Sequence, residues 1–196
     1  MKLGRTVVLL GLTSLLTDVG SEMIFPLLPL FLTVELGAST TFLGLLEGAA
    51  DAVAAVLQRV AGGWADRTGR RKPWVVAGYG LAGVVRPLVG LAGAPWQVLS
   101  VRLTDRVGKG IRSAPRDALI ADSVPAELAG RAFGFHKAMD HAGAVLGPLI
   151  ASAMLYAGVP LRSVFLWTAI PGLLAFPIRR TPSCCCGRVS VASTRR

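Results

Sequence analysis

The sequence predicts an all-α membrane protein that crosses the bilayer six times, and its composition supplies the first evidence. Hydrophobic residues make up 53% of the 196 residues, and the mean hydropathy is +0.58. Charged residues make up only 16% of the chain, whereas soluble domains carry about 25%. The 23 glycines favour close helix packing within lipid. A membrane class is therefore expected before any motif is considered.

Six mainly apolar stretches provide the second observation, because a spanning helix needs about 20 residues. Spanning helices are expected at about 6–32, 41–64, 73–93, 95–114, 132–156 and 161–178. The first stretch has no cleavage pattern and is expected to be a helix rather than a signal peptide. Residues 1–180 should form one bundle, and 181–196 a polar tail that is either disordered or the out-of-frame end of a truncated gene.

The fourth stretch is the most polar of the six. Each charge at the centre of a span costs about 2.5–3.5 kcal/mol. On a helix, however, its charged residues fall within an arc of about 120°, opposite Leu103, Val107 and Ile111. The charged residues on this arc are Arg102, Asp105, Arg106, Lys109, Arg112 and Arg116. The stripe can therefore face a water-filled cavity while the apolar side faces protein or lipid.

The distribution of basic residues is the third observation. The segments 65–73, 115–131 and 179–196 contain Lys and Arg, whereas those near 33–40, 94–95 and 157–160 contain none, although Arg162 lies beside the last. Basic loops remain in the cytoplasm, so both termini are expected there. The net charge of +10 then reflects loop topology rather than nucleic-acid binding.

The residue patterns that several other kinds of site require are missing from the sequence. The three cysteines are consecutive at 184–186, so they indicate neither a disulfide framework nor zinc-ligand spacing. The segment around Lys109 is not a phosphate loop, because no Ser or Thr follows the lysine. No hydrolytic constellation is present, so we expect no enzyme, cofactor or metal site.

The strongest motif is GGWADRTGRRK at residues 62–72, which matches the pattern G-x-x-x-D-R-x-G-R-R in order. The matching residues are Gly62, Asp66, Arg67, Gly69, Arg70 and Arg71. The pattern resembles the loop between the second and third helices of the major facilitator superfamily. The alternative is a generic basic loop that fixes topology. The resemblance implies the N-terminal six-helix half of a transporter from a bacterial drug-efflux-like subgroup, with Asp66 as a breakable cytoplasmic latch.

Two weaker resemblances involve the fifth and fourth helices. Gly143, Gly147 and Pro148 match the G-x-x-x-G-P core of the family's antiporter motif, although Ala151 and Ser152 replace its two later glycines. Simple helix packing by small residues explains the same pattern equally well. On the fourth helix, Arg106, Gly110 and Ala114 match R-x-x-x-G-x-G-x-A, with Arg112 in place of the second glycine.

Ionisable residues lie inside the apolar stretches of five expected helices. They are Asp18 and Glu22; Glu47 and Asp51; Arg86; Arg102, Asp105, Arg106 and Lys109; and His136 and Asp140. Such residues indicate a substrate path or proton relay, and the alternative is internal salt bridging that only holds the bundle together. We expect the acids of the first two helices and the cations of the fourth to converge on one polar cavity that serves as the substrate and proton site.

The resemblance implies a secondary transporter of small molecules in the bacterial inner membrane, exporting by proton-coupled alternating access. Besides lipid, substrate and protons, such a unit requires a second six-helix half or a homodimer. Two alternatives remain open. One is a truncated fragment that inserts without transporting, and the other is a membrane scaffold or assembly protein whose charges pair with partner helices.

Overall fold

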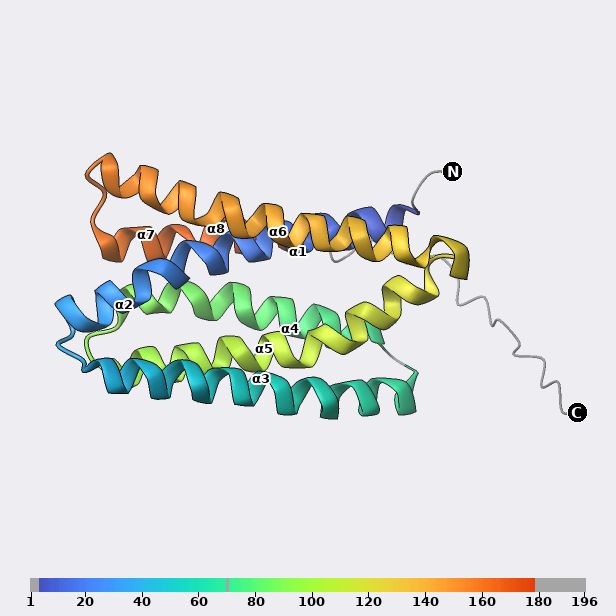
Figure 1. The fold of residues 1–196 in the computed structure, drawn as a ribbon, viewed down its shortest axis with the longest axis horizontal. Helices are drawn as coiled ribbons and strands as arrows, with labels where there is room; N and C mark the ends of the chain where they lie inside the picture. Colours follow the sequence, from blue (N-terminus) through green and yellow to red (C-terminus); the bar gives the residue numbers. More distant parts are fainter. Residues whose placement is uncertain (1–3, 70, 179–196) are drawn as a thin grey trace, which may run out of the picture.

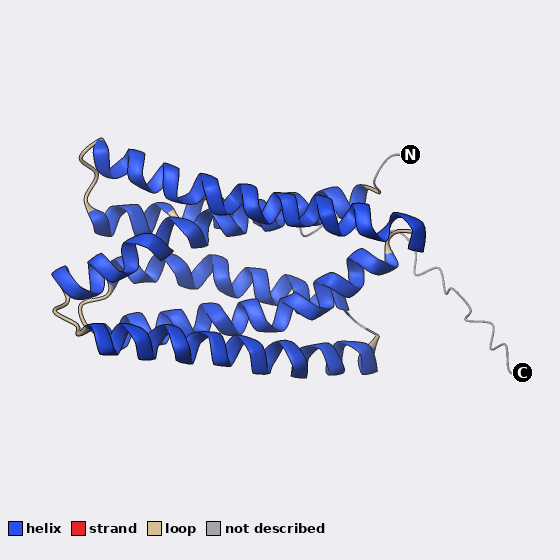
Figure 2. Ribbon diagram, in the orientation of Figure 1, coloured by secondary structure: helices blue, strands red, loops and turns tan. Residues whose placement is uncertain are grey.

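The computed structural model describes residues 4–69 and 71–178, with side chains as far as Ala175. Every regular element in these residues is helical (Figure 2). The all-α membrane fold predicted from composition is therefore found. Arg70 of the basic motif and the polar tail at 181–196 lie outside the described residues.

The first span is one long helix with two irregular turns near its end. It consists of α1 (Arg5–Ile24), the 3-10 turn η1 (Phe25–Leu27), α2 (Leu28–Leu30) and the π-helical η2 (Phe31–Glu35). Pro26 and Pro29 explain the interruption, because proline lacks the N–H that continues an α-helical ladder. The span is therefore 31 residues long, ending three residues beyond the predicted limit.

The second and third spans join at the basic motif. α3 (Thr40–Thr68) begins after Ser39, whose hydroxyl accepts a hydrogen bond from the Phe42 N–H. It ends at Gly69, where a φ of 64° is the left-handed conformation that terminates many helices. α4 (Arg71–Val85) follows and tightens into the 3-10 segment η3 (Arg86–Leu91), which contains Pro87.

The loop predicted at 115–131 is wrong. α5 (Pro95–Asp122) continues through Pro115, and α6 (Ala126–Tyr156) begins three residues after Ser123. Hydropathy marks only the part of a helix that lies in hydrocarbon, so it misses polar turns that extend beyond the bilayer. Figure 1 shows α5 curving towards α6 at this end.

The sixth span is divided into α7 (Leu161–Trp167) and α8 (Ala169–Ile178), which meet at Thr168. Four described helical segments are long and apolar enough to cross a membrane: Arg5–Glu35, Thr40–Thr68, Arg71–Leu91 and Ala126–Tyr156. The charges of α5 and the short lengths of α7 and α8 keep them outside this set. All three nevertheless pack against other helices of the same bundle.

The helices pack as two groups. α1 packs on α6 and α8, and α5 packs on both α3 and α4. Figure 1 shows α6 and α3 on opposite sides of the bundle, with α1, α4 and α5 between them. The connections at Gly69 and 123–125 lie at one end, and those at 36–39, 92–94 and 157–160 lie at the other.

The apolar core is concentrated at the end that contains the second set of connections. Phe31 and Phe165 are fully buried there and meet edge to face at 5.1 Å between ring centroids. Arg162 ties the same end together, since its Nε lies 2.9 Å from a Glu35 carboxylate oxygen and its Nη1 donates to the Ala92 carbonyl. The middle of the bundle is charged instead.

Candidate functional site

A charged cavity of about 370 Å³ lies between α1, α3, η3, α5 and α6. Its charged lining consists of Asp18, Glu22, Arg86, Arg102, Asp105, Arg106, Lys109, Arg112, Arg116, Asp117, Lys137 and Asp140. Phe25, Gln58 and His141 also contribute to the wall. Most of the side chains that line the cavity are therefore charged, although most of the helices that carry them are mainly apolar.

Two glycines set the rotation of α5 that turns its charged stripe towards the cavity. A Cβ on Gly108 would lie 2.8 Å from the Gly78 carbonyl oxygen of α4. A Cβ on Gly110 would lie 2.7 Å from the Leu57 Cβ of α3. Both contacts are too close for a side chain, so α5 approaches α3 and α4 through glycine, and its charged face is turned towards the cavity.

A second pair of glycines brings α6 against the acidic face of α1. A Cβ on Gly143 would lie 2.9 Å from the Asp18 Cβ, and one on Gly147 would lie 2.7 Å from the Glu22 Cβ. The residues predicted as a small-residue motif thus sit at the crossing with α1. Pro148 follows within α6. This crossing places the two α1 acids beside the α6 wall of the cavity.

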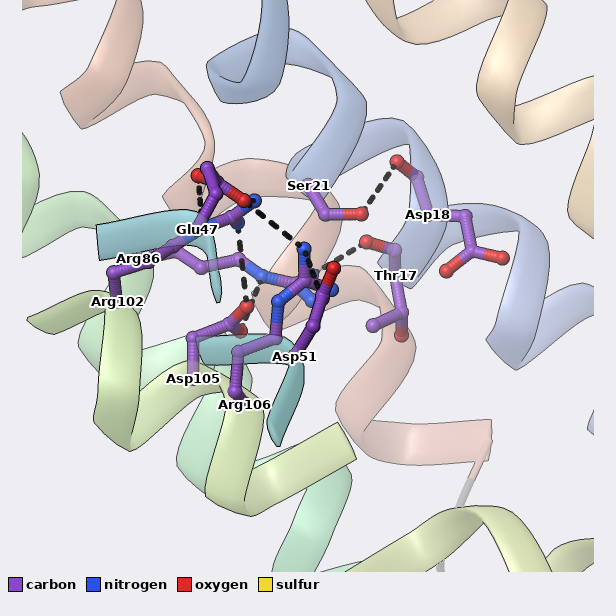
Figure 3. Close-up of polar contacts among 9 residues, drawn as sticks. All are labelled: Thr17, Asp18, Ser21, Glu47, Asp51, Arg86, Arg102, Asp105 and Arg106. Atoms are coloured by element: carbon purple, nitrogen blue, oxygen red, sulfur yellow. Dashed lines mark hydrogen bonds and ion pairs between the residues drawn. The ribbon is translucent and has the colours of Figure 1, made fainter. Parts of the chain in front are cut away.

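A network of ion pairs occupies one end of the cavity (Figure 3). Arg86 donates to Asp105 at 2.8 Å and to the Thr17 carbonyl at 2.5 Å. Arg102 makes two hydrogen bonds of 3.1 Å to Glu47 and lies 3.9 Å from Asp105. Arg86, Arg102 and Asp105 are almost completely buried, so this network replaces the water that their charges have lost.

Arg106 extends this network towards the surface of α3. Its Nη2 lies 3.7 Å from both a Glu47 and an Asp51 oxygen. The Asp51 side chain is 73% exposed. Glu47 and Asp51 contact the α5 arginines but do not themselves line the cavity.

Other hydrogen bonds and ion pairs occupy the other end of the cavity. Arg116 makes two hydrogen bonds to Asp117, of 2.9 and 3.0 Å. Asp140 accepts a 2.6 Å hydrogen bond from Ser14 and lies 3.6 Å from Lys137. His136 is fully buried, with its Nε2 3.5 Å from Asp140, and it does not line the cavity.

Four charged side chains in the middle of the cavity do not take part in these ion-pair networks. Asp18 and Glu22 on α1, and Lys109 and Arg112 on α5, line the cavity. Among residues 4–69 and 71–178, none of their side chains makes an ion pair or a side-chain hydrogen bond. The cavity therefore contains two kinds of charged side chain: those paired with other side chains of the described residues, and those without such a pair.

The structure brings most of the predicted site residues together. Eight of the eleven line the cavity: Asp18, Glu22, Arg86, Arg102, Asp105, Arg106, Lys109 and Asp140. Sequence reasoning did not assign Asp117, Lys137 or His141 to the site. Lys137 and His141 are four residues apart, a spacing that places them on one face of α6 and that marks them in the sequence.

The basic motif forms a surface cluster away from the cavity. Arg71 donates to Asp66 at 2.9 Å and also pairs with Asp122 at the end of α5. One arginine therefore ties the α3–α4 connection to α5. Asp66 and Asp122 are both largely exposed. Gly62 packs against the Ala114 side chain of α5, and Arg67 is exposed at the end of α3.

Comparison with known proteins agrees with this architecture. The family model of the Major Facilitator Superfamily matches residues 10–182. An uncharacterised MFS-type transporter of Methanocaldococcus jannaschii is 37% identical over 88% of this chain, which corresponds to 43% of that protein. An uncharacterised protein of Mycobacterium tuberculosis is 38% identical over 77% of this chain and 37% of that protein.

A relative with a more specific name is also similar. The multidrug resistance protein MdtG of Escherichia fergusonii is 33% identical over 89% of this chain, or 43% of its own length. The chain thus spans about two fifths of the length of the curated relatives it matches. With nearly all of its helical bundle covered by the family model, the chain belongs to the Major Facilitator Superfamily of membrane transporters.

Proposed function

We propose that the chain acts as the N-terminal six-helix half of a secondary transporter that exports small molecules in exchange for protons. The charged cavity within an apolar bundle carries this proposal. Ionisable groups inside a membrane are costly unless they serve transport or pair with one another. Similarity to multidrug resistance protein MdtG supports a drug-like cargo and outward transport.

The two α1 acids are the proposed proton carriers. Asp18 and Glu22 face the cavity without a fixed cationic partner among the described residues. A carboxylate that has no permanent partner can gain and lose a proton as water reaches the cavity. Asp105 is less suited to this role, because it is already paired with Arg86 and Arg102.

Alternating access requires a second half, either on the same polypeptide or as a second copy of this bundle. The two halves would rock about the cavity and expose it to each side in turn. The cluster of Arg71 with Asp66 and Asp122 would act as a latch that breaks and re-forms during this motion. Their surface position supports this role, because exposed ion pairs are weak and exchange readily.

The direct test uses inside-out membrane vesicles containing the chain, with a pH-sensitive dye and a panel of small drug-like molecules. A drug-dependent release of an imposed pH gradient is expected wherever two halves are assembled. Cross-linking and sizing of the same sample report that assembly. Assembled pairs that move neither drug nor protons would overturn the proposal, and inserted monomers without activity would favour a non-transporting fragment.

The proposed orientation has both termini in the cytoplasm. The helix ends that meet near Gly69 carry basic residues: Arg5 begins α1, Arg67 lies in the last turn of α3, Arg71 and Lys72 begin α4, and Arg131 lies early in α6. At the other end, the short connections 36–39, 92–94 and 157–160 contain none, and only Arg162 lies beside them, at the start of α7. This asymmetry supports the orientation by the positive-inside rule. Reporter fusions at Ala38, Gly93 and Gly158 are expected to report outside, and a fusion at Lys72 inside. A cytoplasmic signal at Gly93 would contradict the proposed path of α4 and α5.

A further inference from the structure

Arg112 and Lys109 differ from the other cations of α5. Arg112 is 3% exposed and lines the cavity. Its Nε and Nη1 are buried and have no hydrogen-bond partner within residues 4–69 and 71–178. Its guanidinium lies 4.3 Å from the centre of the Tyr79 ring. Lys109, three residues earlier on the same face, also lacks a paired carboxylate in the described chain.

The acids around this part of the cavity are engaged elsewhere or stand apart. Asp105 pairs with Arg86 and Arg102. Asp117 pairs with Arg116, and Asp140 with Ser14 and Lys137. Asp18 and Glu22 share the cavity but make no ion pair within 4.0 Å with either cation. A buried cation without a partner is expensive, so the site is suited to a negative charge supplied by a ligand.

We propose that Arg112 and Lys109 form an oxyanion subsite, and that the transported molecule carries a carboxylate or phosphate-type group. This inference rests on the proposed transport function and specifies the class of cargo. The planar guanidinium donates several N–H groups to such oxygens, and the lysine adds a compact positive charge. The Tyr79 ring, whose centre lies 4.3 Å from the guanidinium, restricts the position of the Arg112 side chain at the cavity wall.

The proposed site also separates cargo from protons. The subsite lies on α5, whereas the proposed proton carriers lie on α1. The anion binds one wall of the cavity while the opposite acids remain available for protonation. Neutralising an α1 acid should therefore not weaken anion binding, whereas neutralising Arg112 should weaken it.

The experiment measures binding without requiring transport. The purified full-length chain is placed in nanodiscs of zwitterionic lipid, and its Tm is followed while inorganic phosphate or benzoate replaces chloride at constant ionic strength. Both anions should raise the Tm of the wild type, because a ligand that binds only the folded state stabilises it. Arg112→Gln should weaken the apparent affinity by roughly tenfold or more, and Arg112→Lys by less, because it keeps the charge but loses the planar donors.

Two control variants make the result specific. Arg59→Gln removes the same charge from the exposed surface of α3, outside the cavity, and should bind the anions as the wild type does. Glu22→Gln should also bind them normally, so a defect of that variant in proton movement tests the proposed function separately. The ligand-free Arg112→Gln protein should be as stable as the wild type, because it loses an unpaired charge rather than an ion pair.

The outcomes distinguish the sources of the anion. Equal shifts of Tm in the wild type and Arg112→Gln would overturn the subsite. A response that appears only when anionic lipid is added to the nanodisc would assign the site to a lipid headgroup and overturn the small-molecule inference. Stabilisation by a lipophilic cation that is lost in Arg112→Gln would also contradict it. Anion binding without drug-coupled proton movement would leave the subsite supported and count only against the proposed function.

Discussion

Two parts of the charged cavity differ in how their charges are paired. At one end, Arg86, Arg102 and Asp105 are buried and joined to one another by short contacts. In the middle, Arg112 is just as buried but has free guanidinium nitrogens within the described chain. Both groups of residues line the same cavity. Burial alone therefore does not separate a structural charge from a functional one, whereas partnership does.

This difference predicts how each group responds to mutation. Removing one member of a buried pair leaves an uncompensated charge and destabilises the fold strongly. Removing a charge that has no partner leaves nothing uncompensated and should impair only the process that uses it. Stability and activity should thus respond to different residues of one cavity.

The largest effect on stability is expected for Asp105→Asn, because it leaves Arg86 without its 2.8 Å carboxylate and also removes a charge near Arg102. Breaking a buried pair costs about 3–5 kcal/mol, so purified protein should show a much lower Tm and a poor yield. Asp51→Asn is the matched control, since its carboxylate is 73% exposed. Equal Tm values for the two variants would remove the distinction between the two regions.

An intermediate effect is expected for Gly147→Ala. The added Cβ would lie 2.7 Å from the Glu22 Cβ and force α1 and α6 apart. Overpacking of this kind costs about 1–3 kcal/mol, and it should also displace the proposed proton carrier. Gly134→Ala on the same helix is the control, because nothing lies within 4 Å of its added Cβ. A Tm loss that is as large for Gly134→Ala would show that helix packing does not position this acid.

The smallest effect on stability is expected for Asp66→Asn at the surface cluster. Exposed ion pairs contribute about 0–1 kcal/mol, so its Tm and its insertion should match those of the wild type. Transport by an assembled transporter should nevertheless slow, because the ion pair with Arg71 that forms the proposed latch is weakened. Normal transport rates by inserted Asp66→Asn protein would show that the cluster has no part in the motion.

The fold was predictable from the sequence because the features that reveal it lie within single helices. The apolar stretches marked the spans, and the spacing of Arg102, Asp105 and Arg112 marked a buried charged face on α5. The ends of the helices were harder to predict from the sequence. The extension of α5 to Asp122 lies beyond the apolar stretch, and the break at Thr168 occurs within one. Hydropathy reports solvent preference and not backbone continuity.

The composition of the cavity was only partly predictable, because it depends on how helices dock. The spacing of Glu47 and Asp51 on one face of α3 correctly indicated a polar face, yet this face contacts α5 from beside the cavity. His136 and Asp140 share a face of α6, but only Asp140 reaches the lining. The glycine contacts between helices determine which side chains reach the cavity. These contacts depend on packing between segments that are distant in the sequence.

The most direct test of the separation between paired and unpaired charges is to measure Tm and proton movement on the same preparation of Glu22→Gln. Glu22 faces the cavity without a paired cation in the described chain, whereas Glu35 pairs with Arg162 at 2.9 Å and gives the control Glu35→Gln. We predict that Glu22→Gln keeps the wild-type Tm and loses drug-coupled proton movement, while Glu35→Gln retains that movement. A Glu22→Gln protein that is destabilised as strongly as Asp105→Asn, or that still moves protons at the wild-type rate, would contradict this separation.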